Sequence, residues 1–487
     1  MSWKSVLLFL SGFCLASVVQ AQPEVMWSRT YGGEARDECF SLIKTTDGGY
    51  ALAGSTESFG ATERDFWFVQ TDSIGESIWA ERFSRPAVDG CNSILQTADG
   101  GFSLAGYTTS NGANGQDAWL IYVVPGDQRF WARAYGGRSG EECHSHIQTD
   151  DGGFALAGYS ESFANGGCDF WLLRTDSRGD SLWARNYGGV ENERCWEIIQ
   201  TEDGGFALAG YTVSNEENDF QMWLVKTNSN GDSLWSRAYG GTEDDCCFSV
   251  IETTDGGFAM AGSTRSPDSG KYDVLLVRTG SNGDSLWART YGGEDSDKCS
   301  SIRQVAEGGF VLAGYTLSAG AGNTDYWLIR IAANGDSLWS CTFGGEGSEV
   351  CYSVISTDDG GFAMAGYTWS EGEGNSDFWL VKTTPDPAFV SSNGFVPYPS
   401  SLSLLSPYPN PFNSSVSVGF RTAKPGLYAL EVVDPLGKSL GMISQGYQTA
   451  GEHRIVWGAD DLPAGNYWLR LTDVRGGEDV KPIVLVK

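Results

Sequence analysis

Short stretches in which apolar and polar residues alternate recur along most of the chain, and turn residues bound each of them. Between positions 195 and 239, for example, four such stretches lie at 195–201, 206–212, 221–227 and 233–239. Glycine and asparagine in the connections supply the positive φ angles that tight turns need. Alternation over strand-like lengths, with almost no helical periodicity, predicts an all-β protein built from short antiparallel strands.

This four-strand unit is repeated seven times, with a constant step of 52 residues and no insertion or deletion. Paired glycines mark the repeat, beginning at Gly48, Gly100, Gly152, Gly204, Gly256, Gly308 and Gly360. One tryptophan recurs in each fourth strand, at Trp27, Trp79, Trp131, Trp183, Trp235, Trp287 and Trp339. One cysteine recurs in each first strand, at Cys39, Cys91, Cys143, Cys195, Cys247, Cys299 and Cys351. A four-stranded unit repeated in tandem is typical of a β-propeller.

The two ends of the repeat region indicate a closed ring. An extra strand at 25–31 precedes the first unit, and the last unit has only three strands, at 351–357, 362–368 and 377–383. We expect the N-terminal strand to complete the last blade, which gives seven blades of four strands and hides the sheet edges. An open solenoid would instead need atypical capping repeats, and the pattern contains none.

One segment of the repeat carries a family resemblance. Residues 174–183, Arg-Thr-Asp-Ser-Arg-Gly-Asp-Ser-Leu-Trp, resemble the turn-and-tryptophan motif of quinoprotein-like propellers. The whole unit, with Asp-Gly-Gly-Phe-Ala-Leu-Ala-Gly-Tyr, resembles repeats of secreted bacterial propellers, and the likeness covers about residues 25–384. It implies that the repeated tryptophans have a structural role and dock between blades. A shared fold does not imply a shared function, so the quinone cofactor site is not carried over and no cofactor is expected.

The N-terminus has the features of a secretory signal peptide. Lys4 gives a short positive region, residues 6–19 are mostly apolar, and Val-Gln-Ala at 19–21 is a small-residue cleavage site. We therefore assign residues 1–21 to the signal and 22–384 to the propeller. No later run reaches the about 20 apolar residues of a membrane-spanning helix. Residues 385–403 are rich in proline and serine and are predicted to be a linker.

The C-terminal segment, 404–487, is predicted to be a separate small β-sandwich. It opens with Ser-Pro-Tyr-Pro-Asn-Pro-Phe-Asn at 406–413 and contains Leu-Pro-Ala-Gly-Asn-Tyr at 462–467. Together these motifs resemble the C-terminal sorting domain of type IX secretion cargo, an immunoglobulin-like fold. The resemblance implies recognition by the type IX secretion machinery and an extracellular or cell-surface location. An ordinary β-sandwich module is the alternative.

Many acidic residues of the repeats lie in loops on one rim of the ring. The chain has a formal net charge of −30, which disfavours nucleic acid as a partner and favours cations or basic surfaces. The charged residues in the loops that join one unit to the next are mainly acidic, and these loops share a rim with variable loops such as 57–65. Variable loops on a rigid scaffold commonly bind ligands, here a glycan, a cation or a protein. The acidic candidates are Glu38, Glu142, Glu193, Asp245, Asp297 and Glu349. An acidic rim that only keeps the protein soluble is the alternative.

His144 and His146 are the two histidines of the repeats, and at i and i+2 they are expected to share a strand face. A zinc or catalytic site would need a third ligand, which the sequence does not name. The turns at 176–180 and 228–232 faintly resemble calcium loops but carry too few oxygen ligands. The repeated cysteines are expected to lie too far apart for disulfides and to be buried free thiols.

These features favour an exported, non-enzymatic binding or structural protein over an enzyme. The chain contains no His-Glu-x-x-His or phosphate-loop motif. A catalytic centre needs asymmetry, whereas the acids recur from unit to unit. A secreted hydrolase or lyase acting on polysaccharide is the alternative, and a purely structural element of the cell envelope is a third possibility.

Overall fold

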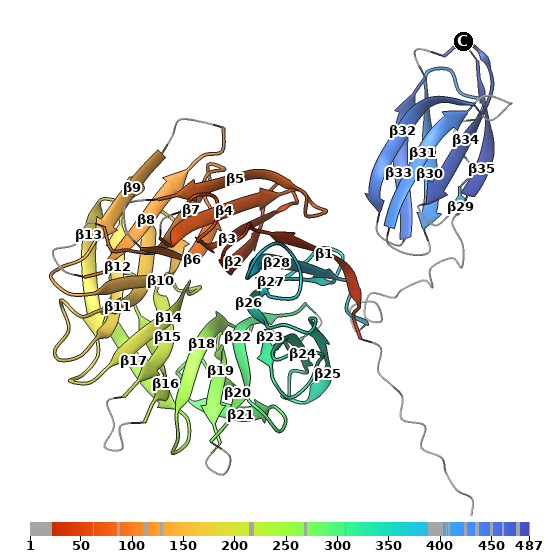
Figure 1. Cartoon of the computed structure of the whole chain (residues 1–487). Coiled ribbons are helices and arrows are strands. Elements are labelled where there is room, and N and C mark those ends of the chain that lie inside the picture. The colour runs from red at the N-terminus through yellow and green to blue at the C-terminus, as the bar shows by residue number, and fades with distance from the viewer. Residues whose placement is uncertain are drawn as a thin grey trace, which may run out of the picture.

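The computed structural model describes residues 22–61, 63–84, 88–110, 115–126, 130–213, 219–266, 270–306, 308–387, 403–405, 407, 410–422, 426–433, 438–448, 451–459, 462–473 and 478–486. Residues 1–21 and 388–402, which hold the expected signal peptide and most of the expected linker, lie outside this part. Seven four-stranded antiparallel sheets surround one axis, and two further β-sheets follow them (Figure 1). The prediction of a seven-bladed all-β propeller is confirmed.

Each blade has strands a to d, counted from the central axis outward. The strands of blades 1 to 3 are β2 (Asp37–Lys44), β3 (Tyr50–Thr56), β4 (Asp65–Thr71), β5 (Ser77–Phe83), β6 (Asp89–Gln96), β7 (Phe102–Thr108), β8 (Asp117–Val123), β9 (Phe130–Tyr135), β10 (Glu141–Gln148), β11 (Phe154–Ser160), β12 (Asp169–Thr175) and β13 (Ser181–Tyr187). Those of blades 4 and 5 are β14 (Glu193–Gln200), β15 (Phe206–Thr212), β16 (Gln221–Thr227), β17 (Ser233–Tyr239), β18 (Asp245–Glu252), β19 (Phe258–Arg265), β20 (Tyr272–Thr279) and β21 (Ser285–Tyr291). Those of blades 6 and 7 are β22 (Asp297–Gln304), β23 (Phe310–Thr316), β24 (Asp325–Ile331), β25 (Ser337–Phe343), β26 (Glu349–Ser356), β27 (Phe362–Thr368), β28 (Asp377–Thr383) and β1 (Val25–Tyr31).

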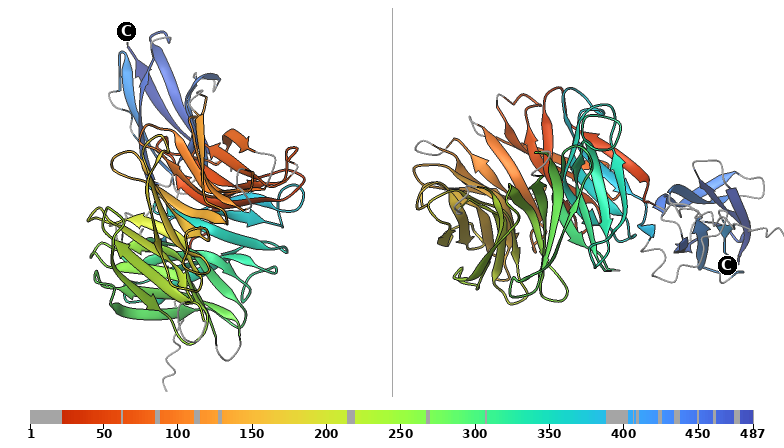
Figure 2. Two further views of the ribbon diagram at one scale, coloured as in Figure 1. Left: turned by 90° about the vertical axis from the view of Figure 1, so that its left-hand side faces the viewer. Right: turned by 90° about the horizontal axis from the view of Figure 1, so that it is seen from below.

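The strand directions alternate, so the connections separate onto two faces (Figure 2). The a–b and c–d turns lie on one face, which we call the turn face. The b–c loops and the d–a loops, which lead to the next blade, lie on the other, which we call the loop face. Strands b and c are almost wholly buried, as expected for sheets packed on both sides by neighbouring blades.

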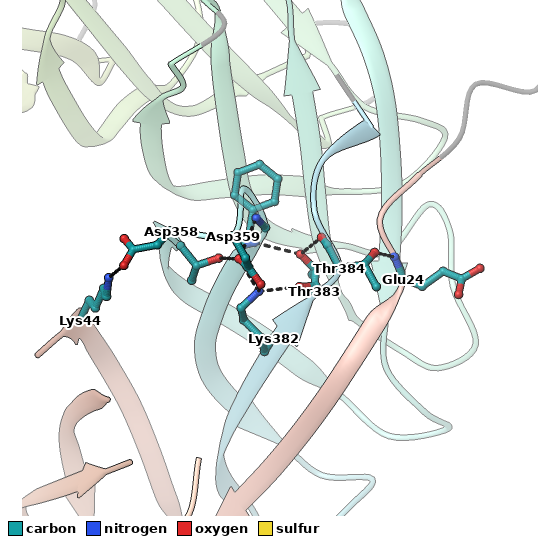
Figure 3. A network of polar contacts seen from close by, with 10 residues as sticks. Glu24, Lys44, Asp358, Asp359, Lys382, Thr383 and Thr384 are labelled. Carbon is teal, nitrogen blue, oxygen red and sulfur yellow. Dashed lines mark hydrogen bonds and ion pairs between the residues drawn. The ribbon is translucent and has the colours of Figure 1, made fainter. Parts of the chain in front are cut away.

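The ring closes through β1, as the sequence predicts. β1 pairs antiparallel with β28, with Thr30 opposite Trp379. Glu24 donates its backbone N–H to Thr384 Oγ1 at 2.9 Å, and the N–H of Thr384 returns a bond to the Glu24 carbonyl at 2.8 Å (Figure 3). Across the same seam, Lys44 of blade 1 forms an ion pair with Asp358 of blade 7 (Figure 3). Closure therefore rests on a shared sheet and on side-chain contacts.

The repeated tryptophans lie in the d strands and pack against the next blade. The ring of Trp27 lies 5.8 Å from that of Tyr50, and Trp235 lies 5.9 Å from Phe258. A Cβ atom at Gly231, whose φ is +77°, would lie 2.6 Å from Trp183. The c–d turn therefore needs glycine both for its left-handed backbone and for the close approach of the indole.

The repeated cysteines of strand a are free, as expected, and all seven are buried. Every a–b pairing shifts register directly after the cysteine, for example between Cys143 and Ser145. This is a β-bulge, in which one residue of strand a has no partner on strand b. The bulge changes which side chains point toward the axis, and the sequence repeat does not reveal it.

The C-terminal sheets share one apolar core. They are formed by β29 (Ser403–Leu404), β30 (Ser415–Thr422) and β33 (Gly451–Gly458), and by β31 (Gly426–Val433), β32 (Ser439–Gln448), β34 (Gly465–Asp473) and β35 (Glu478–Leu485). Val416, Phe420, Leu430, Leu469 and Ile483 meet between the two sheets. None of the helical structure in the described part of the chain is long and apolar enough to span a membrane.

Candidate functional site

Four of the predicted rim acids lie inside the loop face rather than on it. Glu193, Asp245, Asp297 and Glu349 are fully buried. Each accepts a hydrogen bond of 2.6–2.9 Å from the backbone N–H of a glycine four residues earlier in the d–a loop. A carboxylate enclosed in this way shapes its own loop and does not offer an oxygen to a ligand. The sequence repeat could not distinguish these acids from exposed ones.

Glu38 and Glu142 occupy a different position, one residue later in the repeat, and they are partly exposed. Glu38 accepts a hydrogen bond from Arg64 at 2.9 Å. Glu142 accepts one from Asn92 Nδ2 at 3.0 Å and lies 3.3 Å from His144 Nε2. These two acids remain on the loop face near the central axis. Glu38 is paired within its own blade, whereas Glu142 is joined to Asn92 of the neighbouring blade.

The expectation that His144 and His146 share a face is wrong, because the bulge of strand a lies between them. His144 stacks on Trp196 with ring centroids 4.1 Å apart, and its Nδ1 lies 2.6 Å from the carbonyl of Cys195. His146 is buried between Ser93 Oγ at 2.8 Å and Ser103 Oγ at 2.7 Å. Burial lowers the pKa of His146 to about 3, so this imidazole is neutral. Over the described residues, no three His, Cys, Asp or Glu side chains form a group suited to a metal.

A collar of aromatic rings surrounds the axis near the loop-face end of the a strands. It is formed by the residue that follows each repeated cysteine, and it includes Phe40, His144, Trp196, Phe248 and Tyr352, with Asn92 and Ser300 at the same position in blades 2 and 6. The rings touch from blade to blade, at 4.9 Å between Phe40 and Tyr352 and 5.6 Å between Trp196 and Phe248. The blades thus differ at the position next to their invariant cysteine. Comparing that one position among the seven units would have revealed the collar from the sequence.

A cleft opens on the loop face where blades 7 and 1 meet. It has a volume of about 390 Å³ and is lined by Gly32, Gly33, Glu34, Ala35, Glu57, Ser58, Phe59, Gly60 and Glu373. A second cleft of about 450 Å³ shares Ala35 and Glu57 with it, so the two are contiguous. We call the first one the seam cleft. Its three glutamates are exposed and come from the loops of two different blades.

Two exposed aromatic rings lie on this part of the loop face. Phe59, at 55% exposure, has a φ of +58°, a left-handed conformation that is rare for a residue with a bulky side chain. Its ring packs 5.2 Å from Trp67. Trp369, at 49% exposure, lies beside the guanidinium of Arg36. An exposed ring on a strained backbone at a cleft, as at Phe59, is a feature of a binding surface.

These features define the class of protein, a seven-bladed β-propeller followed by a second β-domain. No family model matches the chain. Among curated proteins, the regulatory protein FlaEY of Caulobacter vibrioides is 24% identical over 174 residues. The match covers 31% of this chain and 18% of that protein, so this chain spans about a fifth of its relative's length.

Solved structures with a similar shape are distant in sequence. The Pan2 WD40 domain of Neurospora crassa is 9% identical, with a TM-score of 0.44, over 72% of this chain and 97% of that one. PorZ, a surface component of the type IX secretion system of Porphyromonas gingivalis, is 12% identical, with a TM-score of 0.34, over 94% and 70%. Neither likeness assigns a function to this chain.

Proposed function

We propose that the chain is an exported, non-enzymatic binding protein whose loop face binds a glycan at the seam cleft. The observation that carries the proposal is the seam cleft itself, in which Glu34, Glu57 and Glu373 lie close to the exposed ring of Phe59. Carboxylates accept hydrogen bonds from sugar hydroxyls. The face of an aromatic ring is slightly negative and suits the C–H surface of a sugar ring.

The negative charge of the cleft limits which kinds of glycan it can bind. Three exposed glutamates repel uronic acids and sulfated sugars and favour neutral or amino sugars. Arg36 and Arg64 lie nearby, but each approaches Glu38, by 3.7 Å and 2.9 Å. Export is supported by the sequence features of residues 1–21 and by the motifs at 406–413 and 462–467. The type IX secretion machinery is the proposed partner for export.

A polysaccharide hydrolase is the second candidate, and the same three glutamates favour it. Glycosidases use two carboxylates on opposite sides of the scissile bond. Such an enzyme would release reducing ends from a bound polysaccharide, and Glu57→Gln or Glu373→Gln would abolish the release. Binding without release, retained in part by these variants, is the result expected of the binding protein.

The test uses the chain from residue 22 onward on an array of neutral, amino and acidic polysaccharides. We expect binding to neutral or amino sugars, weakened about tenfold in Phe59→Ala because an aromatic contact contributes roughly 1.5 kcal/mol. The matched control is Phe163→Ala, which removes an equally exposed ring at the position equivalent to Phe59 in blade 3. No binding to any array member, or equal losses in the two variants, would contradict the proposal.

A further inference from the structure

Beneath the loop face, two carboxyl side chains meet at nearly every seam between blades. One is the aspartate that begins strand c, and the other is the acid that begins strand a of the next blade. We call these the seam pairs: Asp377 with Asp37, Asp117 with Glu141, Asp169 with Glu193, Asp273 with Asp297 and Asp325 with Glu349. Asp65 and Asp89 occupy the same two strand positions at the seam of blades 1 and 2. At the seventh seam, Gln221 takes the place of the aspartate and faces Asp245.

The two acids of a pair flank one glycine of the d–a loop. A Cβ atom built on Gly292 would overlap Asp273 and would lie 3.0 Å from Asp297 Oδ2. The same construction on Gly32 overlaps Asp377 and lies 2.8 Å from Asp37 Oδ2. The two carboxyl groups therefore leave no room for a side chain at this position, so only glycine fits. Both carboxyl groups pack against the glycine backbone.

At the seam of blades 7 and 1, the pair is buried without a cation. Asp377 is 2% exposed and Asp37 is fully buried, and the Oδ1 atom of each has no hydrogen-bond partner among the described residues. The titratable groups that act on Asp377 are Asp37 from β2 and Glu373 from its own loop, both acidic. Arg36 lies next to Ser376 along the backbone, but its guanidinium is directed to Glu38 and Trp369.

Two adjacent buried carboxylates cannot both be ionised at ordinary pH. Burial, with the neighbouring Asp37, raises the pKa of Asp377 to about 7. Burial raises the pKa of the strand-c aspartate in four other pairs as well, and in each of them the acid of its own pair adds to the effect: Asp117, Asp169, Asp273 and Asp325.

Both acids of a pair accept hydrogen bonds from loop N–H groups, but those of the strand-a acid are shorter: Asp325 on strand c accepts bonds of 3.0 Å and 3.3 Å from Ala321 and Gly322. Asp37 Oδ2 accepts bonds of 2.8 Å from the N–H of Gly33 and from Ser58 Oγ. Glu349 likewise accepts bonds of 2.9 Å from the N–H of Gly345 and from Thr368 Oγ1. Hydrogen bonds to the charged form favour ionisation, so the proton of a pair belongs on strand c.

The two exceptional seams agree with this assignment. Where strand c lacks its aspartate, it carries Gln221, a neutral amide whose Nε2 donates to the carbonyl of Gly241, while the strand-a acid Asp245 is kept, so this seam holds a single acid. Where the glycine is replaced by Ser84, Asp65 instead forms a 2.5 Å ion pair with Arg82. The equivalent of Arg82 in the other six blades is Thr, Ala or Asn. At these two seams the second acid is thus either absent or paired with an arginine.

We infer that at five seams the strand-c aspartate stays protonated and donates a hydrogen bond to the ionised strand-a acid, joining the b–c loop of one blade to the d–a loop of the next. This bond accounts for the Oδ1 atoms of Asp377 and Asp37 that lack a partner. It also makes the loop face sensitive to pH, because the joint is lost when the proton leaves.

The direction of the effect follows from the raised pKa. An aspartate titrates near 4 in the unfolded chain, so the stabilising proton is fully present below about pH 4. The contribution of Asp377 is lost as the pH rises through about 7. Since Gly32 and Gly33 line the seam cleft, acidification tightens the loops that form it. This effect on the cleft rests on the proposed function, whereas the protonation of the strand-c aspartate does not.

The experiment measures the melting temperature and the infrared C=O band of protonated carboxyls between pH 5 and 8.5, without any glycan and both with and without calcium. We expect the melting temperature of the unaltered chain to fall as the pH rises. Asp377→Asn retains a donor, so it is expected to melt above the unaltered chain at pH 8.5, with a shallower pH slope and a weaker infrared band. Asp37→Asn removes the ionised acceptor and is expected to melt lower at every pH.

Glu371→Gln, an exposed change in the same b–c loop, is the matched control and is expected to keep the pH slope. Asp169→Asn repeats the test at the seam of blades 3 and 4. Equal destabilisation by Asp377→Asn and Asp37→Asn at pH 8.5 would overturn the inference. So would a rise in melting temperature with calcium that Asp377→Asn abolishes, because the pair would then hold a cation. Neither result depends on whether the loop face binds a glycan.

Discussion

The two faces of the propeller each carry a ring of aspartates, and the environments of the two rings are opposite. On the turn face, Asp203 accepts hydrogen bonds from Lys226 at 2.9 Å and from Thr201 at 2.6 Å, and these lower its pKa to about 2. On the loop face, Asp377 meets another acid, and its pKa is raised to about 7. The same residue type therefore titrates several pH units apart at the two ends of one kind of blade.

The comparison shows that the hydrogen-bond or charge partner of a repeated acid, and not its position in the sequence repeat, determines its pKa and its contacts. On the turn face, each carboxylate closes its own a–b turn and is matched by a donor on strand c of the same blade: Arg174 in blade 3, Lys226 in blade 4, Arg278 in blade 5 and Lys382 in blade 7. On the loop face, the acids join different blades. The turn-face aspartates of this ring therefore hold their own blades together, whereas the seam pairs join one blade to the next.

The largest expected effect tests the buried ion pair on the turn face. Arg330 Nε donates to Asp386 Oδ2 at 2.9 Å, and both side chains are almost completely buried. Asp386→Ala leaves the guanidinium without its carboxylate, so we expect the free energy of unfolding to fall by about 3–5 kcal/mol. Urea denaturation followed by tryptophan fluorescence measures it.

The control for Asp386→Ala is Glu76→Ala, which breaks the exposed Arg29–Glu76 pair and is expected to change the stability by less than about 1 kcal/mol. Similar losses in the two variants would show that burial does not decide the strength of these pairs.

A smaller loss of stability is expected where the loop face has no room for an added side chain. In the d–a loop between blades 2 and 3, a Cβ atom at Gly136 would overlap Asp117 and lie 2.7 Å from Glu141. Gly136→Ala is therefore expected to lower the free energy of unfolding by roughly 1–3 kcal/mol through overpacking. In the same loop, a Cβ atom at Gly140 meets nothing nearer than 3.5 Å, so Gly140→Ala is the matched control. A larger loss in Gly140→Ala, measured by the same denaturation, would contradict the packing argument.

The ring and its closure could be predicted from the sequence, because a constant step of 52 residues, a spare first strand and a missing last strand leave one arrangement. The roles of the loop acids could not. Asp37 and Glu38 are neighbours in sequence, yet one is buried under its own loop and the other is partly exposed. In the same way, the bulge after each cysteine places the side chains of His144 and His146 on different sides of strand a. Such outcomes depend on backbone register and space, which alternation of residue types does not encode.

The smallest expected effect is a pH dependence of opposite sign on the turn face. Because the pKa of Asp203 is lowered to about 2 by Lys226 and Thr201, its contribution to stability is present above about pH 4 and is lost as the pH falls through about 2. The carboxylate is more than half exposed, so solvent screening limits the effect to less than about 1 kcal/mol. Asp203→Asn should flatten the melting temperature between pH 2 and 5, whereas Asp169→Asn should flatten it at higher pH. If both variants altered the melting temperature over the same pH range and in the same direction, the two rings of aspartates would not have opposite pKa shifts, and the comparison would be wrong.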